Sequence, residues 1–204
     1  GFVRNGKGNE LDENERVKRV CVYENGRMKR VVQEFNGKEM VEYDENGKKV
    51  YEGGYGGDSV NGFVREGKGY CYEGNGSDMK YCVYGGGSVI RVIVEIKGSV
   101  MTEYDNNGKK KYVGGFKGDR KSGFVRNGEG KEMDGSGKVV FVGYWKDGEY
   151  QEMIVGNNGY NDDSVTELKL SWLVRLKRIV IGNGCFGKVR VFELDGLSEL
   201  ESVV

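Results

Sequence analysis

The chain has no proline, no histidine and no long apolar run. The absence of histidine excludes Ser-His-Asp and Cys-His catalysis and histidine-bound zinc. No run of about 18 apolar residues is present, so the sequence predicts no membrane-spanning helix. Basic and acidic side chains balance at 32 each. This balance argues against non-specific nucleic-acid binding, which depends on a basic excess.

Cysteine is also scarce, and the four residues form no Cys-x-x-Cys pair: Cys21, Cys71, Cys82 and Cys185. Their scatter favours reduced thiols in an intracellular protein over a disulfide framework, although pairing stays open. The polar N-terminal segment has no signal-peptide pattern.

Glycine and aromatic residues are abundant instead. The 204 residues include 36 Gly, 13 Tyr, 8 Phe and 2 Trp, whereas glycine usually makes up about 7% of a protein. Glycine does not recur at every third residue, which excludes collagen. The aromatic content is too high for a disordered segment. The composition therefore indicates a β-rich protein with many turns.

A long internal repeat organises most of the chain. The tetrapeptide Gly-Phe-Val-Arg begins at Gly1, Gly62 and Gly123, so the copies follow each other at a constant offset of 61. Residues 42–70 align without a gap with residues 103–131, and 18 of the 29 positions are identical. Such self-similarity is typical of repeat proteins, in which each unit packs against its neighbours.

Turn signals divide each repeat into short segments. Asn-Gly and Asp-Gly pairs fit type I′ hairpin turns, in which both central residues need positive φ. Between them, apolar and polar residues alternate, which predicts antiparallel strands at 16–24, 28–35, 38–43, 91–96, 100–104 and 138–145. At about 20 residues for two strands with their turns, each repeat should hold three hairpins.

The aromatic segments resemble MORN repeats. Tyr51-Glu-Gly-Gly-Tyr55, Tyr112-Val-Gly-Gly-Phe116 and Phe141-Val-Gly-Tyr-Trp145 are similar to the Tyr-x-Gly-x-Trp core of that family. The segments that begin at Gly62 and Gly123 resemble its second half, and residues 22–30 are closer to the MORN-variant pattern. The resemblance covers about residues 1–156 and implies an elongated antiparallel array of β-hairpins.

Glycine at the third position of this motif leaves space for an aromatic ring of the adjacent hairpin to lie against the backbone. The rings should therefore form a structural ladder along the sheet. Its expected members are Tyr51, Tyr55, Tyr112, Phe116, Phe141 and Trp145. At the repeat offset, Cys21 and Cys82 align with Gly143. This alignment favours a small packing residue there over a reactive or metal-binding thiol.

The chain changes character after Gly159. Leu168, Leu173, Leu176 and Ile179 are followed, at an offset of 24, by apolar residues at 192, 197, 200 and 203. This spacing, with the segment 179–186, resembles leucine-rich repeats of the bacterial-surface-antigen (BspA-like) type. The predicted organisation is MORN-like hairpins over 1–156, a joint over 157–164 and incomplete leucine-rich repeats over 165–204. Both ends interrupt a motif, so we expect a segment of a longer protein.

Candidate chemistry is sparse, and we expect no catalytic residue, cofactor or metal. Gly53-Gly-Tyr-Gly-Gly57 lacks the lysine and following helix of a phosphate-binding loop, so a hairpin turn is favoured. Asp162-Asp163 lacks the spacing of a calcium loop. Asn75-Gly-Ser77 matches a glycosylation sequon that chance alone explains.

Basic residues recur at equivalent positions, at Lys48 and Lys49 and again at Lys109 and Lys110. Equivalent positions of a stacked array form a column, so these lysines are candidates for an interaction stripe that contacts anionic lipid. The alternative is a solvated edge, where lysine discourages aggregation between strands.

The predicted fold is all-β: an elongated antiparallel hairpin array that continues into a leucine-rich-repeat solenoid. The predicted function is a non-catalytic scaffold for protein–protein interaction or assembly, because both resembled families are mostly recognition modules. The alternatives are a membrane-surface or phosphoinositide-associated module, and an accessory region of an enzyme whose catalytic part lies elsewhere. We expect protein partners, no nucleic acid, and a cytoplasmic location in which association with the cytoskeleton or a membrane stays open.

Overall fold

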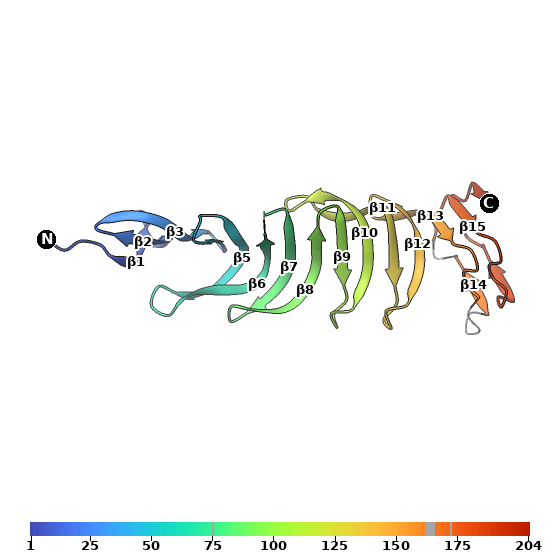
Figure 1. Cartoon of the computed structure of the whole chain (residues 1–204), viewed down its shortest axis with the longest axis horizontal. Coiled ribbons are helices and arrows are strands. Elements are labelled where there is room, and N and C mark those ends of the chain that lie inside the picture. The colour runs from blue at the N-terminus through green and yellow to red at the C-terminus, as the bar shows by residue number, and fades with distance from the viewer. Residues whose placement is uncertain (75, 162–165, 172) are drawn as a thin grey trace. The chain divides into compact units, whose positions relative to one another are not determined.

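The computed structural model describes residues 1–74, 76–161, 166–171 and 173–204. Within these ranges the chain is all β, with 17 strands (Figure 1), which confirms the predicted fold class at this level. No helix in the described part is long and apolar enough to cross a membrane. The sequence assignments at Asn75, Asp162, Asp163 and Val165 lie outside the described residues.

The chain divides into two compact units, one formed by residues 1–98 with 106–108 and the other by 99–105 with 109–204. In the first unit each strand pairs antiparallel with the next one along the chain. Its strands are β1 (Gly6–Leu11), β2 (Val17–Glu24), β3 (Arg27–Asn36), β4 (Glu39–Tyr43), β5 (Lys49–Asp58), β6 (Gly62–Glu73), β7 (Asp78–Gly85) and β8 (Ser88–Lys97).

The second unit begins in the same way and then changes its pairing. Five strands pair antiparallel in chain order: β9 (Val100–Tyr104), β10 (Lys110–Asp119), β11 (Gly123–Met133), β12 (Val139–Lys146) and β13 (Glu149–Val155). The remaining strands are β14 (Glu167–Lys169), β15 (Arg178–Ile181), β16 (Val191–Glu193) and β17 (Ser202–Val203). They pair in parallel, as β13-β15-β17 and β14-β16.

The parallel strands follow the leucine spacing. β14 pairs with β16 at the same offset as the leucines, as in Leu168↔Phe192, and β15 pairs with β17 in the same way, as in Ile179↔Val203. Leu173, Leu176 and Ile179 are at most 1% exposed. The spacing of the apolar residues along the chain therefore matches the spacing of the parallel strands that pair with each other.

The hairpin turns explain only some of the Asn-Gly and Asp-Gly pairs. Both central residues have positive φ at Asn25-Gly26 and Asp147-Gly148, as a type I′ turn requires, and also at Gly86-Gly87, the equivalent pair of the middle repeat. At Asn46-Gly47 and Asn107-Gly108 only the glycine has positive φ. These two pairs belong to longer turns closed by Asp44 and Asp105. Among the described Asn-Gly and Asp-Gly pairs, the expectation of type I′ turns is wrong everywhere except at Asn25-Gly26 and Asp147-Gly148.

Each period of the repeat contains five strands rather than the six of three hairpins. β1 and residues 67–72 of β6 are equivalent in sequence, yet five antiparallel steps separate them. Because five is odd, the two segments run in opposite directions. Equivalent turns of the first unit therefore lie at opposite ends of its strands.

Equivalent side chains of the first unit also lie on opposite faces of the sheet. Residues paired across two strands point to the same face of a sheet, and so do residues two apart on one strand. By this rule one face carries Cys82, Gly69, Gly53, Met40, Phe35, Gln33 and Val20. Cys21 follows Val20 along β2 and so points to the other face. The premise that equivalent positions form one column therefore does not hold within the first unit.

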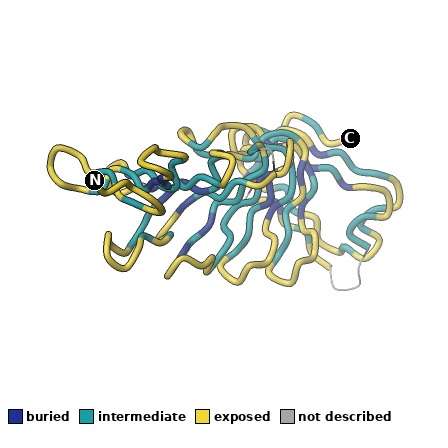
Figure 2. The backbone as a smooth tube through the Cα atoms, turned by 60° about the vertical axis from the view of Figure 1, so that its left-hand side comes forward, coloured by how far each residue is buried: buried dark blue, intermediate teal, exposed yellow. Residues whose placement is uncertain are grey.

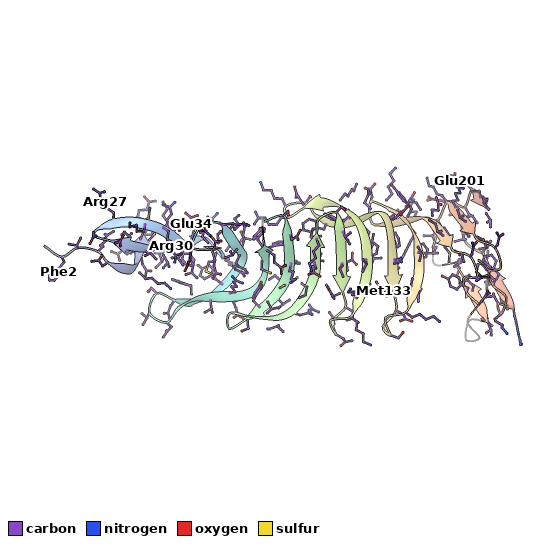
Figure 3. The ribbon with its side chains drawn as sticks, viewed as in Figure 1. Phe2, Arg27, Arg30, Glu34, Met133 and Glu201 are labelled. Atoms are coloured by element: carbon purple, nitrogen blue, oxygen red, sulfur yellow. The ribbon has the colours of Figure 1, made fainter. Side chains whose placement is uncertain are left out.

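Burial is concentrated in the middle of the strands, whereas most of the turns are exposed (Figure 2). One cluster in the first unit joins Met40, Tyr51, Cys82 and Tyr84, each at most 1% exposed. The charged side chain of Arg27 on β3 stands out from the ribbon (Figure 3).

Candidate functional site

The aromatic ladder is built on close contact between a tyrosine ring and a glycine backbone. Tyr51 of β5 lies over Gly69 of β6, and a Cβ at Gly69 would overlap the Tyr51 ring. Tyr112 lies over Gly130 in the same way, one repeat later. The ring covers the neighbouring strand of its own hairpin, rather than the adjacent hairpin that the sequence interpretation supposed.

Four of the six ladder residues are buried. Tyr51, Tyr112 and Trp145 are 0% exposed and Phe141 is 1% exposed, whereas Tyr55 and Phe116 are half-buried. The hydroxyl of Tyr51 donates to the Gly54 carbonyl at 2.7 Å, and burial raises the pKa of Tyr51 to about 12. Edge-to-face contacts join Trp145 to Tyr112 and to Phe141, with ring centroids 5.1 Å apart in each pair. Tyr51, Tyr55 and Phe116 instead contact rings outside the six, such as Tyr84, Phe63 and Phe124.

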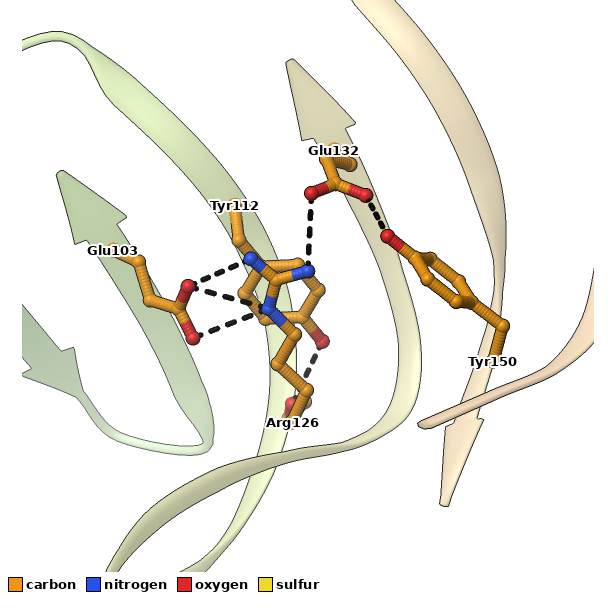
Figure 4. Close-up of polar contacts among 6 residues, drawn as sticks. Glu103, Tyr112, Arg126, Glu132 and Tyr150 are labelled. Carbon is orange, nitrogen blue, oxygen red and sulfur yellow. Dashed lines mark hydrogen bonds and ion pairs between the residues drawn. The ribbon is translucent and has the colours of Figure 1, made fainter. Parts of the chain in front are cut away.

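An arginine packs on the outer face of the buried Tyr112 ring (Figure 4). The Arg126 guanidinium lies 4.4 Å from the ring centroid. Its Nη2 donates to Glu103 Oε2 at 2.7 Å, and its Nη1 donates to Glu132 Oε1 at 3.3 Å. Tyr150 donates its hydroxyl hydrogen to the other Glu132 oxygen. Only 12% of the Arg126 side chain is exposed, so its ion pair with Glu103 is shielded from solvent.

The first unit contains an equivalent but simpler arrangement. Arg65 lies 4.6 Å from the centroid of the Tyr51 ring and donates to Glu42 Oε2, from Nε at 2.8 Å. The second carboxylate is missing, because Cys71 stands where Glu132 would be expected. Burial disfavours the charged form of each arginine and so lowers its pKa, but hydrogen bonds to the carboxylates outweigh this and raise the pKa of both Arg65 and Arg126.

Sequence reasoning missed these arginine clusters, although a signal was present. Arg65 and Arg126 close the Gly-Phe-Val-Arg tetrapeptide, and Glu42 and Glu103 are identical in the aligned repeats. An arginine and a glutamate repeated at the same offset as a buried tyrosine could have been paired. Their separation along the chain hid the contact, since it depends on three successive strands.

The four lysines of the expected stripe have different surroundings. Lys49 Nζ contacts Glu52 Oε2 at 2.7 Å and lies 5.9 Å from the Tyr72 ring, so it is held against the sheet. Lys48 is half-buried, whereas Lys109 and Lys110 are exposed. In the next repeat, Glu52 is replaced by Val113. The two pairs are therefore chemically unequal, and their role as a stripe stays a prediction.

An apolar hollow opens in the second unit where β12 and β13 separate. The last pair in their register is Gly143↔Met153. β12 extends back from it to Val139, and β13 continues to Val155, paired along its other edge with β15. The Tyr160 hydroxyl donates to the Val140 carbonyl at 2.7 Å. The hollow encloses about 710 Å³, and its apolar lining includes Val139, Val140, Val142, Ile154, Val155 and Leu168.

The clearest features of the described residues are the shielded charge pairs and the apolar hollow. The shielded charges are paired with each other, and in the described ranges no three metal-capable side chains gather. A hollow of several hundred cubic ångströms with an apolar lining is typical of ligand and peptide sites. Comparison with protein-family models, curated proteins and solved structures finds no match for this chain.

Proposed function

We propose that the chain is a non-catalytic repeat scaffold that binds other proteins. It combines MORN-like hairpins over residues 1–156 with leucine-rich repeats over 165–204. The observation that carries the proposal is the apolar hollow between β12 and β13. Val139 and Val140, at 44% and 41% exposed, form part of its lining. An exposed apolar concavity on a sheet is typical of a protein-binding surface.

The occupant that best fits the hollow is an extended segment of a partner protein. Residues 139–142 of β12 continue beyond the last pair registered with β13. An extended peptide can add to such an edge through main-chain groups other than the Val140 carbonyl, which the Tyr160 hydroxyl occupies. Its alternate side chains then enter apolar pockets. The valines of β12 would contact those side chains.

The test is affinity isolation from the native source, combined with cross-linking and mass spectrometry. Val140→Arg places a charge in the hollow and should abolish capture of partners that cross-link to residues 139–160. Val89→Arg is the matched control, because Val89 is 50% exposed and lies in the first unit. Loss of the same partners in both variants, or cross-links only outside the hollow, would contradict the proposal.

A second candidate function is attachment to an anionic membrane surface. It is favoured by the consecutive exposed lysines 109–111, because basic clusters contribute about 1 kcal/mol per residue near an anionic leaflet. Lys109→Glu with Lys110→Glu should then reduce flotation with phosphoinositide-containing liposomes. Equal flotation of both proteins, or none by the parent chain at physiological salt, would exclude this candidate.

A further inference from the structure

One position in the repeat changes its chemistry from one copy to the next. Glu10, Cys71 and Glu132 occupy this position in the three successive copies. Glu10 accepts a hydrogen bond from the Tyr23 hydroxyl at 2.9 Å, and Glu132 accepts one from the Tyr150 hydroxyl. The middle repeat therefore has a thiol where the other two have a carboxylate acceptor.

Cys71 has a second thiol beside it. Cys71 of β6 pairs with Lys80 of β7, and Gly69 pairs with Cys82, without a shift in register between them. Cys71 and Cys82 are therefore diagonal neighbours on one face of the sheet. Cys82 is 0% exposed, and the partly exposed Cys71 packs against the cluster that contains it.

A buried hydroxyl on the same face lacks a partner. Tyr84 is 1% exposed, and within the described residues its hydroxyl has no hydrogen-bond partner. An unsatisfied buried hydroxyl costs about 1–3 kcal/mol. Burial raises the pKa of Tyr84, and the Cys71 thiol raises it further. A thiolate at Cys71 would supply the acceptor that Tyr84 lacks.

Cations and carboxylates both lie on the face that carries Cys71, and among them Lys80 favours the ionised thiol. Lys80, opposite Cys71, is paired with Glu73 at 2.5 Å and lies 3.6 Å from Glu95. The same face carries Tyr51, and Arg65 with its partner Glu42.

Hydrogen bonding from Cys82 lowers the pKa of Cys71 most. Burial opposes this change, and Tyr84 and Lys80 lower the pKa further. The same contact raises the pKa of Cys82. The two thiols therefore lose their first proton from Cys71.

We propose that Cys71 is a modification site, a nucleophilic thiolate held by Cys82 and Tyr84 that hydroperoxides oxidise to a sulfenate. The sulfur attacks one peroxide oxygen, an S–O bond forms and the O–O bond breaks. With hydrogen peroxide, the leaving hydroxide takes the proton of the new S–OH group, which gives water and the sulfenate; with an organic hydroperoxide, the leaving alkoxide takes this proton and gives an alcohol. The sulfur is oxidised by two electrons and the peroxide is reduced by two.

The geometry also selects the product. Diagonal neighbours in an antiparallel sheet have Cα atoms about 7–8 Å apart, whereas disulfides need about 4.4–6.8 Å. A Cys71–Cys82 disulfide would require the backbone to move. The expected product is therefore the sulfenate, with Cys82 as the hydrogen-bond donor beside it.

The first measurement is the pH dependence of alkylation of the full chain by iodoacetamide, read for each cysteine by mass spectrometry. The midpoint for Cys71 should lie at least about one pH unit below its value in the urea-unfolded chain, where a cysteine titrates at about 8.5. Cys82→Ala and Tyr84→Phe should each raise this midpoint. A purely structural role of Cys82 would leave it unchanged.

Cys21→Ala is the matched control, because Cys21 is the buried equivalent of Cys82 and its repeat has Glu10 in place of a second thiol. It should leave the Cys71 midpoint unchanged. Melting curves establish that each variant is folded, and Cys82→Ser provides a second variant if Cys82→Ala is not. Hydrogen peroxide followed by dimedone should label Cys71. An unshifted midpoint, or a Cys71–Cys82 disulfide as the main product, would overturn the proposal.

Discussion

At the scale of single residues, the core of the second unit is centred on Trp145. Its ring is 0% exposed and contacts the rings of Tyr112, Phe141 and Tyr150. Its Nε1 is buried without a hydrogen-bond partner among the described residues. The side chain therefore contributes through packing, and its polar atom adds a desolvation cost.

Trp145→Ala should lower the free energy of unfolding by about 3–5 kcal/mol, as for other large buried side chains. Trp145→Phe should cost clearly less, because it keeps an aromatic ring and removes the unpaired N–H. Thermal and urea denaturation measure both, with Tyr144→Ala as the control, since Tyr144 is 43% exposed. If Trp145→Ala melts like the parent, the ladder is not structural.

Glu15 has a positive φ at a turn position that glycine occupies in the equivalent turns, which begin at Asp44, Asp105 and Asp134. It has a φ of 61°, whereas the corresponding residues Gly47, Gly108 and Gly137 are glycines with φ of 76°, 78° and 91°. The left-handed region costs a non-glycine residue about 1–2 kcal/mol. The turn forms nonetheless, because Asp12 Oδ1 accepts the Arg16 backbone N–H at 2.9 Å.

Glu15→Gly should therefore stabilise the chain by up to about 1 kcal/mol, since relief of strain exceeds the added entropy cost of glycine, about 0.5–1 kcal/mol. The midpoint of thermal unfolding would rise. Glu13→Gly, in the same turn but without positive φ, should not stabilise. A lower midpoint for Glu15→Gly would show that its side chain makes a larger contribution than the strain.

At the scale of elements, the arginine clusters join three successive strands. Glu103 lies on β9, Tyr112 on β10 and Arg126 on β11. The ion pair between Arg126 and Glu103 therefore joins β11 to β9 across β10, which lies between them. A shielded ion pair contributes little net stability compared with an apolar packing, but removing one partner leaves the other charge buried.

Arg126→Ala should cost about 3–5 kcal/mol, because it leaves both Glu103 and Glu132 without their cation. Arg65→Ala should cost less, since only Glu42 loses its partner and the Arg65 side chain is more exposed, at 26% against 12%. Urea denaturation compares the two. Combining Arg126→Ala with Glu103→Gln should recover part of the loss, and no recovery would argue against the buried-charge explanation.

At the scale of the whole molecule, the strands of the described residues pair with strands that are next to them, or two places away, in chain order. A local change should therefore stay local. Leu176 is 0% exposed in the second unit. Leu176→Ala should accelerate amide exchange in β13, β15 and β17 and leave β1–β3 unchanged. Hydrogen exchange with mass spectrometry measures this, and Val174→Ala, at 51% exposed, is the control. Faster exchange throughout the chain would indicate a single cooperative unit.

Much of the architecture follows from local patterns. The alternation of apolar residues predicted antiparallel strands, and the leucine period matches the parallel pairing of β14 with β16. Asn25-Gly26 and Asp147-Gly148 form the expected type I′ turns. These features depend on one strand or one turn, so the residues within that element determine them. The family resemblance and the function stay predictions.

The tertiary structure alone decided the relation between repeats and the partners of the charged residues. Five strands in each period reverse the direction of equivalent strands in the first unit and place equivalent side chains on opposite faces of its sheet. Arg126 and Glu103 meet because β9, β10 and β11 lie side by side. Cys71 and Cys82 become neighbours only through the β6–β7 register. A sequence pattern specifies which face of a strand is apolar, but register and strand count determine which side chains share that face.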